Sequence, residues 1–356
     1  MTNGSLIYKD NISTETNPSI DRVLKAGAIV HARTATPEFS CAPFTHSKLW
    51  GITRTPWNLR YSCGGSSGGS GASLAAGTSA LASGSDIGGS IRIPASMCGV
   101  VGFKPPFGRN PDSPPFNLDP YNHIGPLART VADCAILQNV MAGPHPEDIA
   151  TVRPKLRIPA DLGDIKGWRI ALCANPARYD IDPDVAKNTQ AAAELLRASG
   201  ATVDEVDLGW DRDAVARAAH AHYGTIFAPS IAAFARKHRK LMNDYTLAFA
   251  ELTKTTGKGD YLEGLLIEAG MYRSLGALFP EIPDPALPDP AAARHQGRRV
   301  LCEAATAHQR QAARRHRALA DDHLLQHRQP LPGDQHAVRP GIQRRADGSL
   351  DRRPHL

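Results

Sequence analysis

Apolar residues recur at helical spacing in the first part of the chain, with short apolar runs between these stretches. Ile20, Val23 and Leu24 form a helical stripe that predicts a helix over residues 19–26, started by Asn17-Pro18 and ended by Gly27. The apolar run 28–32 (AIVHA) that follows predicts a buried strand. Further along we expect a helix over 67–76, strands over 80–85 and 98–103, and, after a GPLARTVAD start, a helix in 125–142.

The second part shows a strand–helix–strand pattern. Strands are predicted at 169–174 and 202–206, with a helix over 184–199 between them, started by Asp182-Pro183 and ended by Gly200. Helices are also expected within 220–250 and 261–278. This repeated β-α-β punctuation predicts an α/β protein with a mostly parallel sheet.

The character of the chain changes after Phe279. No Phe, Tyr or Trp follows, and seven of the 14 histidines fall in residues 286–356. Apolar periodicity is absent there, so we expect no packed element in this tail. Two interpretations stay open: a disordered tail, or a segment translated in the wrong frame of a GC-rich gene. We accordingly expect one domain over 1–285 and a separate low-complexity tail over 286–356.

Composition narrows the function further. The formal net charge of +6 comes from the tail, where thirteen arginines face seven acidic residues, so the preceding residues are neutral and a nucleic-acid partner is not expected. The six cysteines form no CxxC pair, which favours reduced thiols in the cytoplasm. Neither a leader-type apolar region at the N-terminus nor an 18-residue apolar run occurs, so secretion and membrane spanning are not expected.

The segment 64–94 carries the candidate chemistry. It holds nine glycines and eight serines, but its apolar stretch 74–76 is unlike a flexible linker. Glycine-rich backbone can gather N–H groups around one point, where they stabilise an anion. Three interpretations of the segment compete. The first is a phosphate loop, but its lysine is missing, because no lysine lies between Ser62 and Arg92. The second is a G-x-S-x-G elbow with Ser67 as nucleophile, which here follows a poor strand, and the third is a plain glycine-rich turn.

A fourth interpretation joins the two serine clusters in one site. A serine hydroxyl is a weak nucleophile, and a second serine can pass its proton to a base such as neutral lysine. Ser90 would attack, because it follows Gly88-Gly89, whose N–H groups can face a developing oxyanion.

The motifs GGSSGGSGASLAAG and GSDIGGSIRIPASMCGVVGFKP resemble the signature of the amidase signature family. The resemblance extends to GAIVHARTATPEF, GITRTPWN and GPLARTVADCA, and so covers most of residues 4–142, with 64–142 as the signature core. It implies an α/β/α architecture, with a mixed, largely parallel sheet covered by helices on both faces. It also implies amide hydrolysis through an acyl-enzyme, with a Ser–cis-Ser–Lys triad and without a metal or cofactor.

Residue by residue, the resemblance gives Ser90 the nucleophile position and Ser66 that of the bridging cis-serine. Ile87, Gly88, Gly89 and the N–H of Ser90 match the oxyanion hole. Supporting positions, assigned to hydrogen bonds rather than proton transfer, fall on Ser67, Asp86 and Arg92.

The lysine is the point of departure from this pattern. The family's Lys-Asp segment precedes a Gly-Ser pair, and here Gly4-Ser5 already matches that pair, so Lys9-Asp10 is out of register. This register predicts that the chain is incomplete at its start, and the altered tail predicts that it is incomplete at its end. We therefore expect weak or absent activity. Lys104, just after a strand, is expected to be structural.

The expected partner is a small-molecule amide, and a homodimer is left open. The substrate is not legible, although His220, His222 and Tyr223 are candidates for the lining of its pocket. The alternative function is a non-catalytic or partner-dependent polypeptide of the amidotransferase type, since a subunit of the tRNA-dependent amidotransferases shares the signature.

Overall fold

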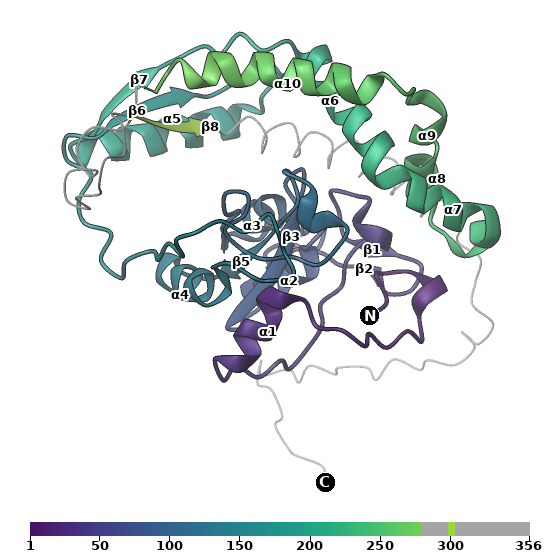
Figure 1. The fold of residues 1–356 in the computed structure, drawn as a ribbon. Coiled ribbons are helices and arrows are strands. Elements are labelled where there is room, and N and C mark those ends of the chain that lie inside the picture. The colour runs from purple at the N-terminus through teal and green to yellow at the C-terminus, as the bar shows by residue number, and fades with distance from the viewer. Residues whose placement is uncertain (280–297, 303–356) are drawn as a thin grey trace, which may run out of the picture. The chain divides into compact units, whose positions relative to one another are not determined.

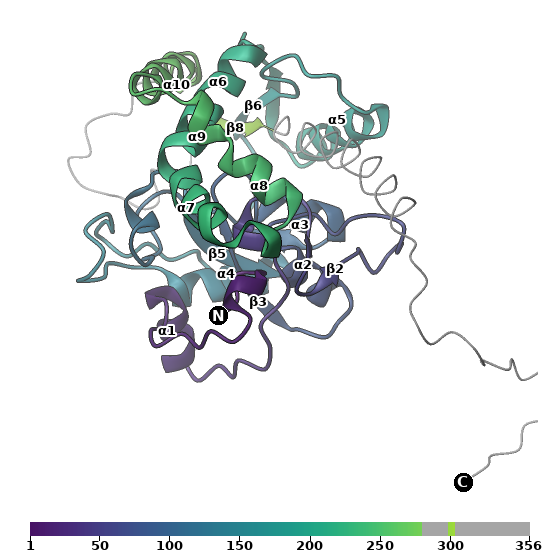
Figure 2. The same ribbon diagram turned by 90° about the vertical axis from the view of Figure 1, so that its right-hand side faces the viewer.

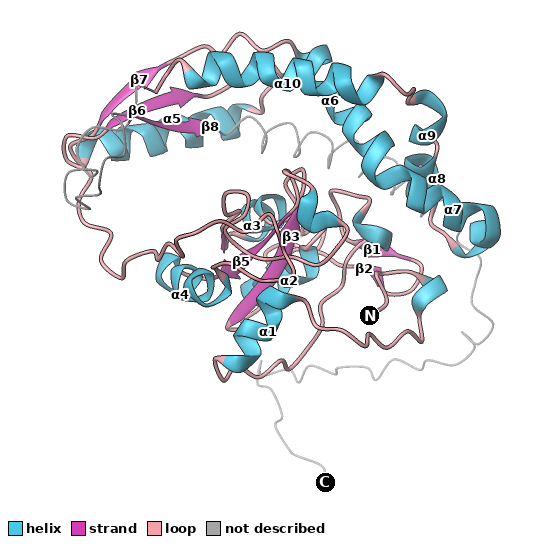
Figure 3. Cartoon of the chain, in the orientation of Figure 1, coloured by secondary structure: helices cyan, strands magenta, loops and turns pink. Residues whose placement is uncertain are grey.

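The computed structural model describes residues 1–279 and 298–302, and Figure 1 follows this chain from purple to yellow. The first part contains short elements around a small sheet (Figure 3): η1 (Leu6–Tyr8), α1 (Pro18–Lys25), η2 (Glu38–Ser40), β1 (His46–Ser47), β2 (Gly51–Ile52), α2 (Gly68–Ala75), β3 (Leu81–Asp86), α3 (Arg92–Cys98), β4 (Val101–Gly102), η3 (Phe116–Leu118), β5 (His123–Ala128) and α4 (Val131–Met141).

The second part holds the predicted strand–helix–strand unit and a run of helices, which Figure 2 shows from another side: β6 (Arg169–Cys173), α5 (Pro183–Ala198), β7 (Thr202–Glu205), α6 (Arg212–His222), the π-helical turn η4 (Tyr223–Phe227), α7 (Ala228–His238), η5 (Arg239–Leu241), α8 (Asp244–Ala250), α9 (Leu252–Thr255), α10 (Asp260–Gly276) and β8 (Arg298–Cys302).

The predicted α/β class is confirmed, and the strands are mixed in direction. β7, β6 and β8 pair in parallel in that order, as the β-α-β pattern requires. β3, β5 and β4 form an antiparallel sheet in which β5 is central, and β1 pairs with β2 antiparallel. The expected largely parallel pairing therefore holds for one of the three sheets in the described residues.

Helix boundaries follow local capping signals. Asn17 accepts from the Ser19 N–H at the start of α1, and the Asp182 carboxylate accepts from the Asp184 N–H at the start of α5. Both helices carry proline in their first turn, where its missing N–H costs no hydrogen bond. These helices, and those expected at 67–76 and 261–278, are confirmed within two residues.

Two strand predictions and one helix prediction need correction. The run 28–32 forms no strand, and Ile29 is 88% exposed, because no strand in the described residues pairs with it. The strand predicted over 98–103 shrinks to β4, since α3 continues to Cys98 and ends at Gly99 with φ +65°. The helix expected in 125–142 is shorter, because it begins only with α4 at Val131. The stretch 123–128 before it forms strand β5, since pairing on both sides outweighs its Gly-Pro content.

Most of the predicted tail, 286–356, lies outside the described residues. Within it, Arg298–Cys302 forms β8 beside β6, where we expected no packed element. No helix in the described part of the chain is long and apolar enough to cross a membrane.

Two apolar clusters position the elements that matter for the site. Leu74, Ile91, Ala95 and Leu127 join α2 and α3 to the β3–β5 sheet, so the glycine-rich segment is attached to the core at both ends. A second cluster joins Phe39 to Ile231 of α7 and to Met242, which follows η5. Residues from far apart in the sequence are thereby brought to one cavity.

Candidate active site

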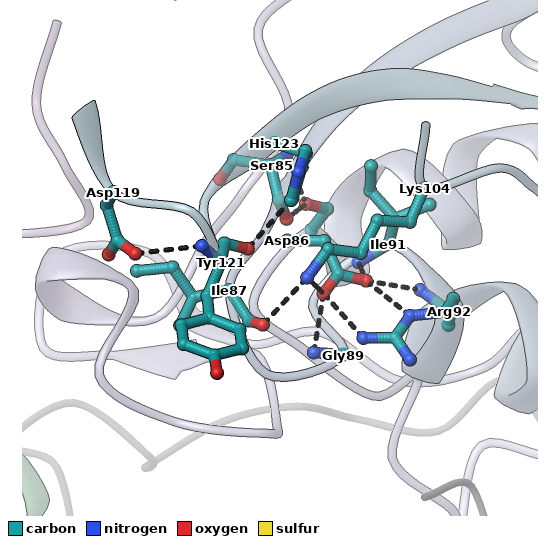
Figure 4. A network of polar contacts seen from close by, with 11 residues as sticks. Ser85, Asp86, Ile87, Gly89, Ile91, Arg92, Lys104, Asp119, Tyr121 and His123 are labelled. Atoms are coloured by element: carbon teal, nitrogen blue, oxygen red, sulfur yellow. Dashed lines mark hydrogen bonds and ion pairs between the residues drawn. The ribbon is translucent and has the colours of Figure 1, made fainter. Parts of the chain in front are cut away.

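The loop between β3 and α3 is organised by the carboxylate of Asp86 (Figure 4). Asp86 is the last residue of β3 and is fully buried. Its Oδ1 accepts from the Gly89 N–H at 2.6 Å, and its Oδ2 from the N–H groups of Ile91 at 3.0 Å and Arg92 at 3.3 Å. The loop thus closes around a single anionic group, which fixes residues 87–90.

Two cations neutralise this carboxylate. Arg92 donates to it through Nε at 3.0 Å and through a terminal nitrogen at 2.9 Å, and Lys104 Nζ lies 3.3 Å from it. Burial by itself would raise the pKa of Asp86, but the hydrogen bonds from Arg92 and the charges of Lys104 and Arg92 outweigh it and lower the pKa to about 2. Asp86 is therefore ionised at neutral pH.

Lys104 also holds the loop from its carbonyl side. Its Nζ donates to the Ile87 carbonyl oxygen at 2.8 Å, as the dashed line in Figure 4 shows. Burial lowers the pKa of Lys104, and Asp86 opposes that effect. The lysine that the sequence marked as structural is thus directly bonded to the first residue of the candidate oxyanion loop.

The two candidate serines meet at one cavity of about 470 Å³. Ser66, which follows a cis Gly65–Ser66 peptide bond, and the half-buried Ser90 both line it, together with Ser85, Ile87 and Gly88. The Ser67 N–H donates to the Ser90 carbonyl at 3.1 Å and ties the two segments together. The structure therefore brings Ser66, Ser90 and the loop to one place.

Ser67 lies outside this cavity lining. Its hydroxyl accepts from the Ser85 N–H at 3.3 Å and lies 3.4 Å from the Ser85 carbonyl oxygen. These contacts attach the start of α2 to the end of β3. They fit the supporting role expected for Ser67 and do not present it as an elbow nucleophile.

Gly89 differs from its neighbours in the predicted oxyanion hole. Its N–H is the one that bonds Asp86 at 2.6 Å, so that donor is directed away from the cavity. Gly89 is also absent from the cavity lining, whereas Ile87, Gly88 and Ser90 belong to it. In this structure Gly89 holds the loop, with a φ of +124° that an L side chain rarely adopts.

Aromatic side chains dominate the rest of the cavity wall, and sequence reasoning missed most of them. None of the described lining residues is charged at neutral pH. The rings come from both parts of the chain: Tyr8, Phe39, Phe116, Tyr223, Phe227, Phe234 and Phe249. Phe39 stacks on Phe234 with centroids 5.1 Å apart, which joins the two walls.

The wall near Phe39 is fixed by a buried carboxylate that sequence reasoning passed over. Glu38 accepts from Ser5 Oγ at 2.7 Å, from the Asn243 N–H at 2.7 Å and from Asn243 Nδ2 at 3.0 Å. The sequence signal for Glu38 was its place next to Pro37 in the TATPEF loop. Apolar periodicity does not predict the role of a polar residue in such a loop.

The three residues 220, 222 and 223 separate clearly. Tyr223 lines the cavity, and His222 is buried behind it, with Nε2 3.2 Å from Asp119 Oδ2. His220 contacts Thr255 Oγ1 at 2.9 Å and does not line the cavity. The contact between Asp119 and His222 could not be predicted from the sequence, because the two residues are 103 positions apart.

The comparison with known proteins decides the family. The sequence matches the amidase family over residues 1–323. The chain belongs to the amidase family. Among curated proteins, the indoleacetamide hydrolase of Bradyrhizobium japonicum is 41% identical over 213 residues, which cover 58% of this chain and 45% of that protein. A subunit of the glutamyl-tRNA(Gln) amidotransferase of Roseiflexus castenholzii is 41% identical over 196 residues, which cover 53% of this chain and 39% of that protein.

A solved structure gives the same result for the fold of this amidase-family chain. A bacterial aryl acylamidase, described as an amidase signature enzyme, superposes with a TM-score of 0.70 at 26% identity, over 75% of this chain and 57% of that one. The chain spans less than half the length of the two curated relatives it matches above.

None of the described lysines of this amidase-family chain lines the cavity that holds Ser66 and Ser90. Lys9 lies in an exposed ion pair with Asp10, and its side chain is 61% exposed. Lys9 is thus a surface lysine, and the expectation that Lys9-Asp10 is out of register with the family's lysine segment stays a prediction.

Proposed function

We propose that this chain hydrolyses a carboxylic amide through an acyl-enzyme on Ser90. The observation that supports it is that Ser66 and Ser90 line one cavity together with the Ile87-Gly88 backbone. The amidase-family match agrees with this chemistry.

In the proposed reaction, Ser90 Oγ attacks the carbonyl carbon of the amide and its proton passes to Ser66, which gives up its own hydroxyl proton to a general base. The new C–O bond converts the carbonyl oxygen to an oxyanion, which the N–H groups of the loop stabilise. When the C–N bond breaks, the nitrogen leaves with a proton returned through Ser66. Water then attacks the acyl carbon, releases the acid and restores the Ser90 hydroxyl.

We expect this chain to carry out the reaction slowly. The relay through Ser66 needs a base, and none of the described cavity-lining residues is a lysine, carboxylate or histidine. A serine enzyme without its base retains only the fraction of its rate that the oxyanion hole and substrate binding supply.

Covalent labelling tests the proposal without requiring turnover. A fluorophosphonate forms a Ser Oγ–P bond with loss of fluoride, and peptide mapping identifies the serine. We expect the label on Ser90, lost in Ser90→Ala and kept in Ser67→Ala. Label on Ser67 in the unmodified chain would refute the assignment.

A second candidate is a partner-dependent role, favoured by the similarity to a subunit of a glutamyl-tRNA(Gln) amidotransferase. The cavity argues for the first candidate, because no described lining residue is charged, so that an amide carrying charged groups, such as glutamine, would lose its hydration there without a charged partner. Ammonia release from an uncharged aromatic amide but not from glutamine supports the stand-alone amidase. Co-purification with a second polypeptide, together with ammonia transfer to an acceptor, supports the alternative.

We also propose a cytoplasmic location, because Cys41, Cys63, Cys98, Cys134 and Cys173 are free thiols. The homodimer stays a prediction, which light scattering on the purified chain tests.

A further inference from the structure

The Tyr223 hydroxyl lies directly over the candidate oxyanion loop. A Cβ added to Gly88 would collide with Tyr223 Oη, and the next nearest atom would be Tyr223 Cζ at 3.6 Å. Tyr223 and Gly88 line the same cavity as Ser66 and Ser90. A phenol oxygen is thus in contact with the backbone that faces the reacting carbonyl.

The ring of Tyr223 is held in this place from both sides. Tyr223 begins the π-helical turn after α6, a distortion often found at functional sites. Its ring meets Phe249 edge-on at a centroid distance of 5.6 Å. On the chain side, the preceding His222 is fixed by Asp119 at 3.2 Å, and the following Gly224 is so close to Thr256 that no side chain would fit.

The hydroxyl is a hydrogen-bond donor throughout the neutral pH range. Burial, with the negative charges of Asp86 and Asp119, raises the pKa of Tyr223 to about 12, against an opposing effect of Arg92. It therefore keeps its proton where an amidase would operate.

The candidate oxyanion loop can use an additional hydrogen-bond donor, because one of its backbone N–H groups already bonds a carboxylate. The Gly89 N–H bonds the Asp86 carboxylate and does not line the cavity. An oxyanion stabilised by fewer backbone N–H groups gains most from a neutral, preorganised side-chain donor in a partly buried site.

We propose that the Tyr223 hydroxyl donates a hydrogen bond to the substrate's carbonyl oxygen as it becomes an oxyanion. This role rests on the proposed attack by Ser90. As the Ser90 Oγ–C bond forms, the C=O electron pair moves onto oxygen and the O–H···O contact strengthens. The proton stays on Tyr223, and the pair returns to the carbonyl when the C–N bond breaks. His222 and Asp119 act as positioning residues.

Two measurements test this role, with the exposed Tyr272 as a matched control. The first is the second-order rate at which a fluorophosphonate labels Ser90, because its transition state places negative charge on a phosphoryl oxygen. We expect Tyr223→Phe to lower this rate about 10- to 1,000-fold. Tyr272→Phe should stay within about twofold of the unmodified chain.

The second measurement does not need a reactive serine. In a Ser90→Ala background, 3-phenylpropanoate serves as an anionic probe for the loop and 3-phenylpropanamide as its neutral counterpart. We expect Tyr223→Phe to weaken carboxylate binding at least fivefold and amide binding less than twofold, by calorimetry. Equal weakening of both would assign Tyr223 a packing role and overturn the proposal, as would unchanged carboxylate binding.

The outcomes separate this inference from the proposed function. Absence of label on Ser90 in the unmodified chain refutes the nucleophile assignment, and carboxylate binding then decides the role of Tyr223 as an anion donor. Label on Ser90 at the same rate in Tyr223→Phe refutes the role of Tyr223 and leaves the nucleophile in place.

Discussion

The Gly89 N–H and the Asp86 carboxylate are joined by a 2.6 Å hydrogen bond that turns the loop after β3 back on itself. The other bonds to this carboxylate within the described residues come from the same loop, from the first turn of α3 and from Lys104. A single buried anion thus determines where Ile87, Gly88 and Ser90 lie.

Replacing Asp86 should therefore affect stability and site together. In Asp86→Asn the cations of Arg92 and Lys104 face each other without their shared anion, so we expect a loss of about 3 kcal/mol in the free energy of unfolding. Ser90 labelling should slow at least tenfold. Urea denaturation and the labelling rate measure the two effects.

The control is Asp204→Asn, whose partner Arg169 is half exposed. An exposed pair contributes about 1 kcal/mol or less. Equal losses for the two variants would contradict the central place of Asp86.

Asp86 also predicts how stability depends on pH. Its pKa is lowered to about 2 in the folded chain, below the value of about 3.9 typical of an unfolded one. As the pH falls, the unfolded state therefore binds the proton before the folded state does. The contribution of ionised Asp86 to the free energy of unfolding is complete above about pH 4 and is lost as the pH falls through about 2. The shift corresponds to about 2–3 kcal/mol.

Unfolding free energies measured at pH 5 and pH 2.5 test this dependence. In Asp86→Asn the free energy of unfolding should fall less between these two pH values, because only the other carboxylates still titrate. Parallel curves for the two chains would show that Asp86 does not titrate as described.

Lys104 should matter more for the site than any exposed lysine. Lys104→Met removes the bond to the Ile87 carbonyl and one partner of Asp86, so the loop loses an anchor. We expect Ser90 labelling to slow about tenfold, which is less than the roughly hundredfold or greater cost of removing an oxyanion donor altogether. Lys9→Ala, at an exposed position, should leave it unchanged. Loss of labelling in Lys9→Ala would instead identify Lys9 as the base.

Gly88 and Tyr223 should be coupled through space. Gly88→Ala places a methyl group against Tyr223 Oη, and we expect it to cost about 1–2 kcal/mol of stability by forcing the packed ring to move. In a Tyr223→Phe background the nearest atom is the ring carbon at 3.6 Å, an ordinary contact, so the same change should cost less than about 0.5 kcal/mol. A double-mutant cycle measures the difference, and additive costs would show that the two residues do not touch.

The sequence by itself determined the local parts of this protein. The glycine-serine segment, the helices with Asn-Pro or Asp-Pro starts, and the β6–α5–β7 unit all follow from signals within a few residues. The same holds for the family, because its motifs are contiguous. Ser66, Ser90 and Asp86 could be named from these motifs alone.

Tertiary structure decided everything that depends on distant partners. Strand β5 forms despite Gly125-Pro126 because neighbours flank it on both sides, while the apolar run 28–32 stays exposed because no described strand pairs with it. Tyr223 reaches Gly88, and His222 reaches Asp119, only through the packing of the later helices on the first part of the chain. Periodicity records which face of an element is buried, but not against which residue, and the cavity depends on the second.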